Sequence, residues 1–327
     1  MLPGMGFLVL SQQEVERLLP MEECIEAMVE ALAALARGEV QNPLRFVTRS
    51  SDGGSFMGLM PAHRAGASPA WSLKAICVFP DNPKRGLDAH QGAVVLFDGG
   101  TGEIRAVVNA PAITAIRTAA VSAVATRLLA REDARELAVL GAGVQARSHL
   151  EAMRAVRSFE RVRIHSRSAD HARALAEEAG GEAVGSAEEA VRGADVVVTA
   201  TNSREPVLRR EWLGRGAHVN AVGSSIPSAR ELDTQTVVDC ALFVDRREST
   251  VNEAGDYLMP LQEGAIAGPE HIRAEIGELL VGAGEGRRSP DEVTVFKSLG
   301  LAVEDLAAAE HALRRAEAEG AGTRIDF

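Results

Sequence analysis

The stretch ELAVLGAGVQARSHL, Glu136–Leu150, decides the fold. A short apolar run leads into two glycines and then into a helical pattern, with Gly141, Gly143 and Ala146 in the order G-x-G-x-x-A. Gly141 allows a tight turn, Gly143 lets the backbone approach a pyrophosphate, and Ala146 lets the helix pack on the strand. This context predicts a dinucleotide site at the start of the helix, where free N–H groups favour phosphate. A glycine-rich turn without a ligand is the alternative.

Strand and helix patterns alternate after this stretch, which is typical of a parallel, doubly wound sheet. Strands are predicted over 136–140, 161–165, 194–200, 217–222 and 241–245. Residues 40–110 differ, because short β-type runs there are separated by Gly, Pro, Asn or Asp, and FDGGTGE is a hairpin signal. The predicted fold is therefore α/β, a Rossmann-type doubly wound parallel sheet plus an N-terminal α+β domain with antiparallel strands.

The chain ends carry helical signals. Ser11 and Glu14 form a capping-box pattern, and the helical run that follows ends at Gly38. A long helix is predicted near the C-terminus, where it returns to the first domain. The last residues, AGTRIDF, are expected to be poorly ordered.

Composition excludes several classes of protein. The chain has 327 residues, a net charge of -11 and a pI near 5.3, which argues against nucleic acid and anionic membrane surfaces as partners. No apolar run approaches the roughly 18 residues of a membrane span, and the first residues lack the basic region of a signal peptide. Cys24, Cys77 and Cys240 share no metal-ligand spacing, so we expect no metal and a reduced, cytoplasmic protein.

The second strand of the dinucleotide unit informs the choice of cofactor. It reads RVRIHSRS, and Ser166, Arg167 and Ser168 stand where an acid usually holds the adenosine ribose. Because two hydroxyls and a guanidinium can bind a 2′-phosphate, NADP(H) is favoured, with NAD(H) as the alternative. Arg167 as a solvated loop residue is the competing interpretation.

One arginine lies in an unusual setting. Arg117 is the only charged residue between Arg105 and Arg127, in a helix of small apolar side chains. A guanidinium cannot lose its proton to escape burial, so a buried Arg117 needs an anion.

The chain resembles the ornithine cyclodeaminase/μ-crystallin family over nearly its full length. The resemblance lies in GLMPAH, SLKAI, ITAIRTAAVSAVAT, GAGVQA, HVNAVGSS, EAGD and TVFKSLGLAVED. It implies a substrate-binding and dimerisation domain, residues 1–118 plus about 303–327, and a Rossmann domain, residues 119–302. It also implies a homodimer formed through the first domain's strands.

The resemblance implies roles for single residues. Arg45 and Arg117 would bind the substrate carboxylate, and Lys74 would lie beside the reacting carbon. A lysine in an apolar pocket can donate a proton to a substrate nitrogen. Without the family, Lys74 suits the exposed face of a strand, and Arg45 suits an edge strand. Met60 is a further substrate-site candidate. The predicted cofactor-binding residues are Thr118, Gly141, Gly143, Val144, Gln145, Ala146, Ser166, Arg167, Ser168, Thr201, Val222, Gly223, Ser298, Leu299 and Gly300.

Two departures from the family's cyclodeaminases narrow the expected reaction. Those enzymes carry an acid where this chain has Gly58 and an aspartate where it has Ser225. Asp233, further along, matches a structural position and gets no role. We therefore expect an NAD(P)H-dependent reductase of α-imino acids or ketimines, or the reverse amino acid dehydrogenase. The alternatives are ornithine cyclodeaminase, an NADPH-bound binding protein with little turnover, and a generic Rossmann dehydrogenase.

Overall fold

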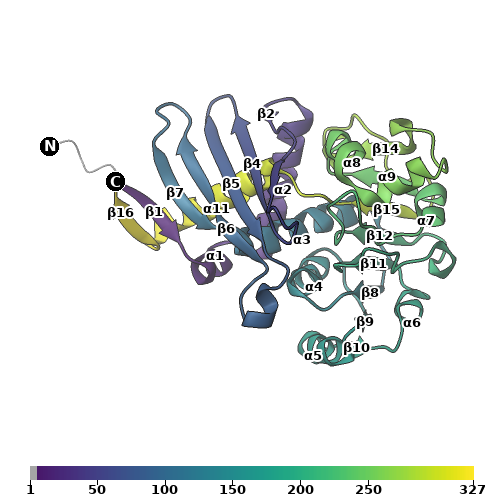
Figure 1. Ribbon diagram of the computed structural model, residues 1–327. Helices are drawn as coiled ribbons and strands as arrows, with labels where there is room; N and C mark the ends of the chain where they lie inside the picture. The colour runs from purple at the N-terminus through teal and green to yellow at the C-terminus, as the bar shows by residue number, and fades with distance from the viewer. Residues whose placement is uncertain (1–5) are drawn as a thin grey trace. The chain divides into compact units, whose positions relative to one another are not determined.

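A computed structural model describes residues 6–327. The chain divides into two compact units. The first unit contains the described residues up to Arg117 together with Leu301–Phe327, and the second unit is Thr118–Gly300. Figure 1 labels their helices and strands.

The first unit is built on one eight-stranded sheet, in the order β16-β1-β7-β6-β5-β4-β2, with β3 paired to β4. Its elements are β1 (Gly6–Leu10), α1 (Gln12–Leu18), α2 (Met21–Ala36), β2 (Val40–Gln41), β3 (Phe46–Arg49), β4 (Phe56–Arg64), β5 (Ala70–Val78), η1 (Asn82–Arg85), β6 (His90–Asp98), β7 (Ile104–Asn109), the start of α3 (Ala110–Leu129), α11 (Ala302–Glu319) and β16 (Thr323–Asp326).

The predicted antiparallel strands of residues 40–110 are confirmed, since β4, β5, β6 and β7 pair antiparallel in chain order. The turn between β6 and β7 is the predicted hairpin, where Asp98 Oδ1 accepts the amides of Gly100 and Thr101. The capping box is also present, because Ser11 and Glu14 exchange hydrogen bonds at the start of α1. Local side-chain chemistry thus gives both features from sequence alone.

The expectation for the last residues is wrong. Thr323–Asp326 forms β16, which pairs antiparallel with β1. Gly320 and Gly322 both have positive φ, which ends α11 and turns the chain back along the sheet. The added strand satisfies backbone groups that β1 would otherwise leave open at the sheet edge.

The second unit holds an eight-stranded parallel sheet, in the order β10-β9-β8-β11-β12-β15-β13-β14. Its elements after α3 are β8 (Glu136–Leu140), α4 (Val144–Val156), β9 (Arg161–His165), α5 (Ala169–Ala179), β10 (Glu182–Ala183), α6 (Ala187–Val191), β11 (Val196–Thr199), η2 (Arg210–Trp212), β12 (His218–Ala221), α7 (Thr234–Asp239), β13 (Ala241–Val244), α8 (Arg247–Glu253), α9 (Gly255–Gln262), η3 (Pro269–His271), β14 (Ile272–Glu275), α10 (Ile276–Leu280) and β15 (Thr294–Lys297).

This sheet confirms the predicted doubly wound fold. Strands β10, β9, β8, β11, β12 and β15 follow the 3-2-1-4-5-6 order of dinucleotide-binding sheets, with the reversal between β8 and β11. The central strands β11, β12, β13 and β15 are fully buried, as is typical of a parallel sheet that helices cover on both faces. The fold thus brings every strand's carboxyl end to one edge, where ligands bind in such sheets.

Helix α3 corrects one expectation about apolar runs. It has 20 residues and a mean hydropathy of 1.3, which is enough by length and composition to cross a membrane. However, 78% of its apolar window is buried within the protein. The small side chains that make it apolar also let it pack as a core helix.

Candidate active site

Strand β5 places Lys74 on the buried face of the first unit's sheet. Its neighbours Ala70, Ser72 and Ile76 alternate inward with it, and Lys74 itself is only 2% exposed. Lys74 pairs directly with Met60 on β4, which is also buried. The structure therefore brings these two candidates together and excludes the interpretation of Lys74 as an exposed strand residue.

Helix α11 brings two acids to this lysine. Lys74 Nζ donates to Asp305 Oδ1 at 3.1 Å, and Arg117 Nε donates to the same oxygen at 3.0 Å. Arg117 Nη1 also donates to Glu304 Oε2 at 2.7 Å. The acids stand in the first turn of α11, where the helix dipole favours negative charge. Asn42 Oδ1 fixes that turn by accepting the Val303 amide at 2.9 Å.

The anion that Arg117 needs is therefore present within the protein. Arg117, Glu304 and Asp305 are at most 3% exposed, and each cationic group is joined to a carboxylate. This arrangement explains the arginine in the apolar helix without a substrate. The carboxylate role that the resemblance implies for Arg117 stays a proposal.

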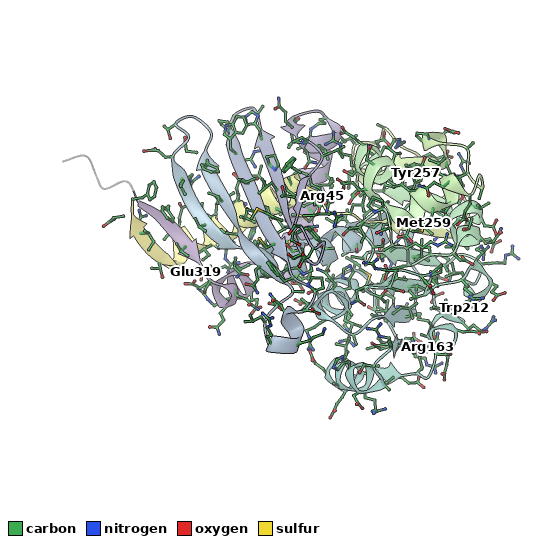
Figure 2. All side chains as sticks on the ribbon, in the orientation of Figure 1. Arg45, Arg163, Trp212, Tyr257, Met259 and Glu319 are labelled. Atoms are coloured by element: carbon green, nitrogen blue, oxygen red, sulfur yellow. The ribbon has the colours of Figure 1, made fainter. Side chains whose placement is uncertain are left out.

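Burial lowers the pKa of Lys74 to about 8. Asp305 opposes that shift, whereas the nearby charges of Arg117 and Arg45 add to it. Arg45 lies half-buried in the segment that leads into β3, and Figure 2 labels its side chain. A lysine poised near neutral pH can be an ammonium or an amine, which is what a proton-transfer group requires.

The ion pairs of this cluster join two cations to two acids. Lys74 and Arg117 are the cations, and Glu304 and Asp305 are the acids. Asp305 Oδ2 is buried and has no hydrogen-bond partner in the part of the chain that the structure describes. The cluster can therefore accept one further hydrogen-bond donor, which an N–H group of a ligand would supply.

The glycine loop of the second unit has the backbone that a dinucleotide needs. Gly141 has φ +121°, and a Cβ there would lie 2.4 Å from the Ala200 carbonyl oxygen. Gly143 caps α4, and a Cβ there would meet nothing within 4 Å. Ala146 is fully buried beneath them. The loop is thus closed on the strand side and open above Gly143 and the first residues of α4, including Val144 and Gln145, so it fits a pyrophosphate.

The end of β9 carries the three residues that inform cofactor choice. Ser166 directly follows the strand, Arg167 is exposed, and Ser168 caps α5 by accepting the His171 amide. Arg167 makes no ion pair or hydrogen bond with the described residues. Two hydroxyls and a guanidinium at this point suit a phosphate.

The remaining cofactor candidates fall into two groups. Val222, Ser298 and Thr118 are buried, and the Ser298 hydroxyl has no partner among residues 6–327. In contrast, Thr201 and Gly223 donate their amides to the Glu231 carboxylate. Leu299 and Gly300 likewise donate theirs to Asp245 Oδ2. These four residues hold the site's backbone in shape, and their amides are already engaged.

The sequence patterns did not single out the buried charged residues that organise both units. These residues are Glu231, Asp245, Asp256, Lys297, Glu304 and Asp305. Four of them, Asp256, Lys297, Glu304 and Asp305, stand in the quoted motifs EAGD and TVFKSLGLAVED. These residues could have been found as charged residues inside otherwise apolar segments, which is the pattern that singled out Arg117.

Comparison with known proteins gives a consistent result. A sequence model described as the ornithine cyclodeaminase/mu-crystallin family matches residues 6–320. A ketimine reductase mu-crystallin of Mus musculus is 41% identical, covering 92% of this chain and 95% of that protein.

Two solved structures are similar along their whole length. One is Thermococcus litoralis Delta(1)-pyrroline-2-carboxylate reductase in complex with NADH and L-proline, with 37% identity, a TM-score of 0.93, and coverage of 98% of this chain and 100% of that one. The other is an archaeal alanine dehydrogenase dimer with bound NAD, with 34% identity, a TM-score of 0.92, and coverage of 99% and 100%.

Proposed function

Because the chain belongs to the ornithine cyclodeaminase/μ-crystallin family, we propose that it reduces the C=N bond of cyclic α-imino acids. It is an NAD(P)-dependent oxidoreductase of imino and amino acids. In the proposed reaction the cofactor supplies a hydride to the α-carbon, and a proton is added to the nitrogen. The product is the α-amino acid, and the reverse reaction is amino acid oxidation.

The carrying observation is Lys74, a buried lysine with two arginines nearby. We assign Arg45 and Arg117 as the cationic donors for the substrate carboxylate. Lys74 gives its proton to the imine nitrogen as the hydride arrives, and a pKa of about 8 keeps it charged at neutral pH. Met60 lies opposite Lys74 and provides apolar packing for the ring.

A panel of substrates tests this proposal. Purified protein with NADPH or NADH is given Δ1-pyrroline-2-carboxylate, pyruvate with ammonia or methylamine, or ornithine, and cofactor oxidation is followed by absorbance. Oxidation with the cyclic imino acid, exceeding that with pyruvate and an amine, supports the proposal. Absence of oxidation with every imino acid contradicts it.

Ornithine cyclodeamination is the second candidate, and Gly58 speaks against it. Gly58 lies on β4 on the same buried face as Met60, so this face has no acid at that position. Ser225 likewise replaces the family aspartate. Formation of proline and ammonia from ornithine without net cofactor consumption would favour this candidate. A binding protein with little turnover is favoured only if every substrate fails while NADPH still binds.

We also propose that NADPH is preferred over NADH. Ser166, Arg167 and Ser168 support this because no acid there repels a 2′-phosphate. The two similar solved structures contain NADH or NAD, so NADH is the competing cofactor. Arg167→Ala should lower NADPH affinity about tenfold and leave NADH affinity within about twofold. Equal affinities of the wild-type protein for both cofactors would contradict the preference.

A homodimer is proposed from the outer face of the first unit's sheet. Phe46 on β3, Met57 on β4 and Trp71 on β5 are 63%, 43% and 47% exposed. Exposed apolar side chains gathered on neighbouring strands indicate an interface. Trp71→Glu should convert a dimer to a monomer in sedimentation, whereas a wild-type monomer would contradict the proposal.

Three unpaired cysteines support a reducing, cytoplasmic compartment.

A further inference from the structure

The carboxylate of Glu231 is fully buried and accepts four hydrogen bonds. Its Oε1 accepts the amide and the hydroxyl of Thr201, both at 2.7 Å. Its Oε2 accepts the Gly223 amide at 2.6 Å and the Thr199 hydroxyl at 2.7 Å. Each oxygen thus accepts one backbone amide, which can only donate. Burial raises the pKa of Glu231, whereas Lys297 and the threonine hydroxyls oppose that shift.

These donors come from two separate loops. Thr199 ends β11 and Thr201 follows it, whereas Gly223 lies just after β12. The loops touch each other closely, because a Cβ on Gly223 would lie 2.1 Å from the Thr201 carbonyl oxygen. Glu231 is therefore the group that fastens both loops in one arrangement.

The backbone of Glu231 is itself held in place by a second buried acid. Asp256 Oδ1 accepts the amides of Glu231 and Leu232 at 2.8 and 2.9 Å. The other Asp256 oxygen lies 3.1 Å from Lys297 Nζ at the end of β15. Asp256 is fixed by α9, whose neighbouring Tyr257 (Figure 2) is buried in the core of the second unit. Glu231 is thus tied through Asp256 to a third strand and to a core helix.

The position of these loops in the sheet indicates which half of a dinucleotide they would contact. The end of β9, beside the glycine loop, is where the adenosine ribose is held in this fold. Strands β11, β12 and β15 form the other mononucleotide-binding half, which receives the nicotinamide end. We propose that Glu231 is a positioning residue that shapes the loops after β11 and β12 for the nicotinamide half of the cofactor. This inference rests on the proposed use of a nicotinamide cofactor.

Glu231→Gln is an informative variant because it keeps the shape of the side chain and removes only one acceptor oxygen. A glutamine can offer an acceptor oxygen to only one of the two backbone amides, and its NH2 group then faces the other. Whichever way the amide turns, either the Thr201 loop or the Gly223 loop loses its partner. The matched control is Glu205→Gln, the same change at an exposed residue of the loop that follows β11.

The experiment measures binding rather than turnover. Dissociation constants of NADH and of ADP-ribose, which lacks the nicotinamide, are measured by calorimetry for the wild-type protein and both variants. We expect Glu231→Gln to weaken NADH about tenfold, because a hydrogen bond to a charged group is lost. ADP-ribose should stay within about twofold, and Glu205→Gln should change neither constant.

Thr199→Val keeps the test informative if Glu231→Gln does not fold. It removes a single buried hydroxyl that donates to Glu231, and it should weaken NADH about threefold with ADP-ribose unchanged. Unchanged NADH affinity, or an equal loss for both ligands, would overturn the inference. Failure of the wild-type protein to bind NADH and NADPH would instead contradict the proposed function.

Discussion

Each unit buries a small group of charged side chains, and the two groups are built differently. In the first unit, Lys74 and Arg117 share the oxygen Oδ1 of Asp305, and Arg117 also binds Glu304. In the second unit, two acids, Glu231 and Asp256, face the single cation Lys297.

The difference lies in which groups satisfy the acids. Both oxygens of Glu231 in the second unit accept backbone amides and threonine hydroxyls. The cluster of the first unit is held by ion pairs and leaves Asp305 Oδ2 without a hydrogen-bond partner among the described residues. The saturated Glu231 fixes the shape of its loops, whereas Asp305 keeps an oxygen for a ligand. We therefore assign chemistry to the first cluster and positioning to the second.

Loss of Lys74 should give the largest effect. Lys74→Met should lower kcat for imine reduction about thousandfold, because the proton donor is removed. NADH affinity, which depends on the second unit, should stay within about twofold. Stopped-flow kinetics and calorimetry measure the two quantities. An equal fall in both would break the division of roles between the clusters.

Neutralising one acid in each cluster compares how much each acid contributes to the free energy of unfolding. Asp305→Asn leaves Lys74 and Arg117 without their shared carboxylate, and should cost about 3 kcal/mol of unfolding free energy. Glu231→Gln leaves the Asp256–Lys297 pair intact and should cost about 2 kcal/mol. Urea titrations followed by circular dichroism give both values. A larger loss for Glu231→Gln would reverse the comparison.

The pKa of Lys74 predicts the pH dependence of the reaction. Reduction uses the ammonium form, so its kcat/KM should fall about tenfold per pH unit above about pH 8. Oxidation of the amino acid uses the amine form and should fall below about pH 8. A reduction rate that stays flat from pH 7 to about 10 would contradict Lys74 as the donor.

The same shift predicts a pH dependence of stability. The folded pKa lies below the ordinary value of 10.5, so between about pH 8 and 10.5 the unfolded chain binds the extra proton, and stability should rise with pH. Subtracting the urea stability of Lys74→Met removes the contribution of other groups. A difference that falls over this interval would contradict the assignment.

An exposed ion pair gives the smallest expected effect and calibrates the others. Arg105 and Glu317 pair at 3.0 Å, but their side chains are 44% and 46% exposed. Glu317→Gln should cost less than about 0.5 kcal/mol in the same urea titration. A cost comparable to that of Asp305→Asn would mean that burial does not set the importance of the charged clusters.

The fold was predictable because its signals are local in sequence. The glycine loop, the strand alternation of the second unit and the Asp98 hairpin each depend on neighbouring residues. The pairing of Lys74 with Asp305 could not be predicted from the sequence, because 231 positions separate the two residues. For the same reason β16 was missed, since its partner is the first strand of the chain. Thr201 and Gly223 were named as cofactor residues, but their tie to Glu231 follows only from the packed loops.

The two chain ends form one unit, and this has a consequence for synthesis. Lys74 and Arg117 leave the ribosome long before α11, which carries their carboxylate partners at the far end of the chain. The second unit, contained in Thr118–Gly300, is complete by then. The nascent protein therefore completes its second unit before its first. A chain that stops before α11 carries Lys74 and Arg117 without the acids that allow their burial.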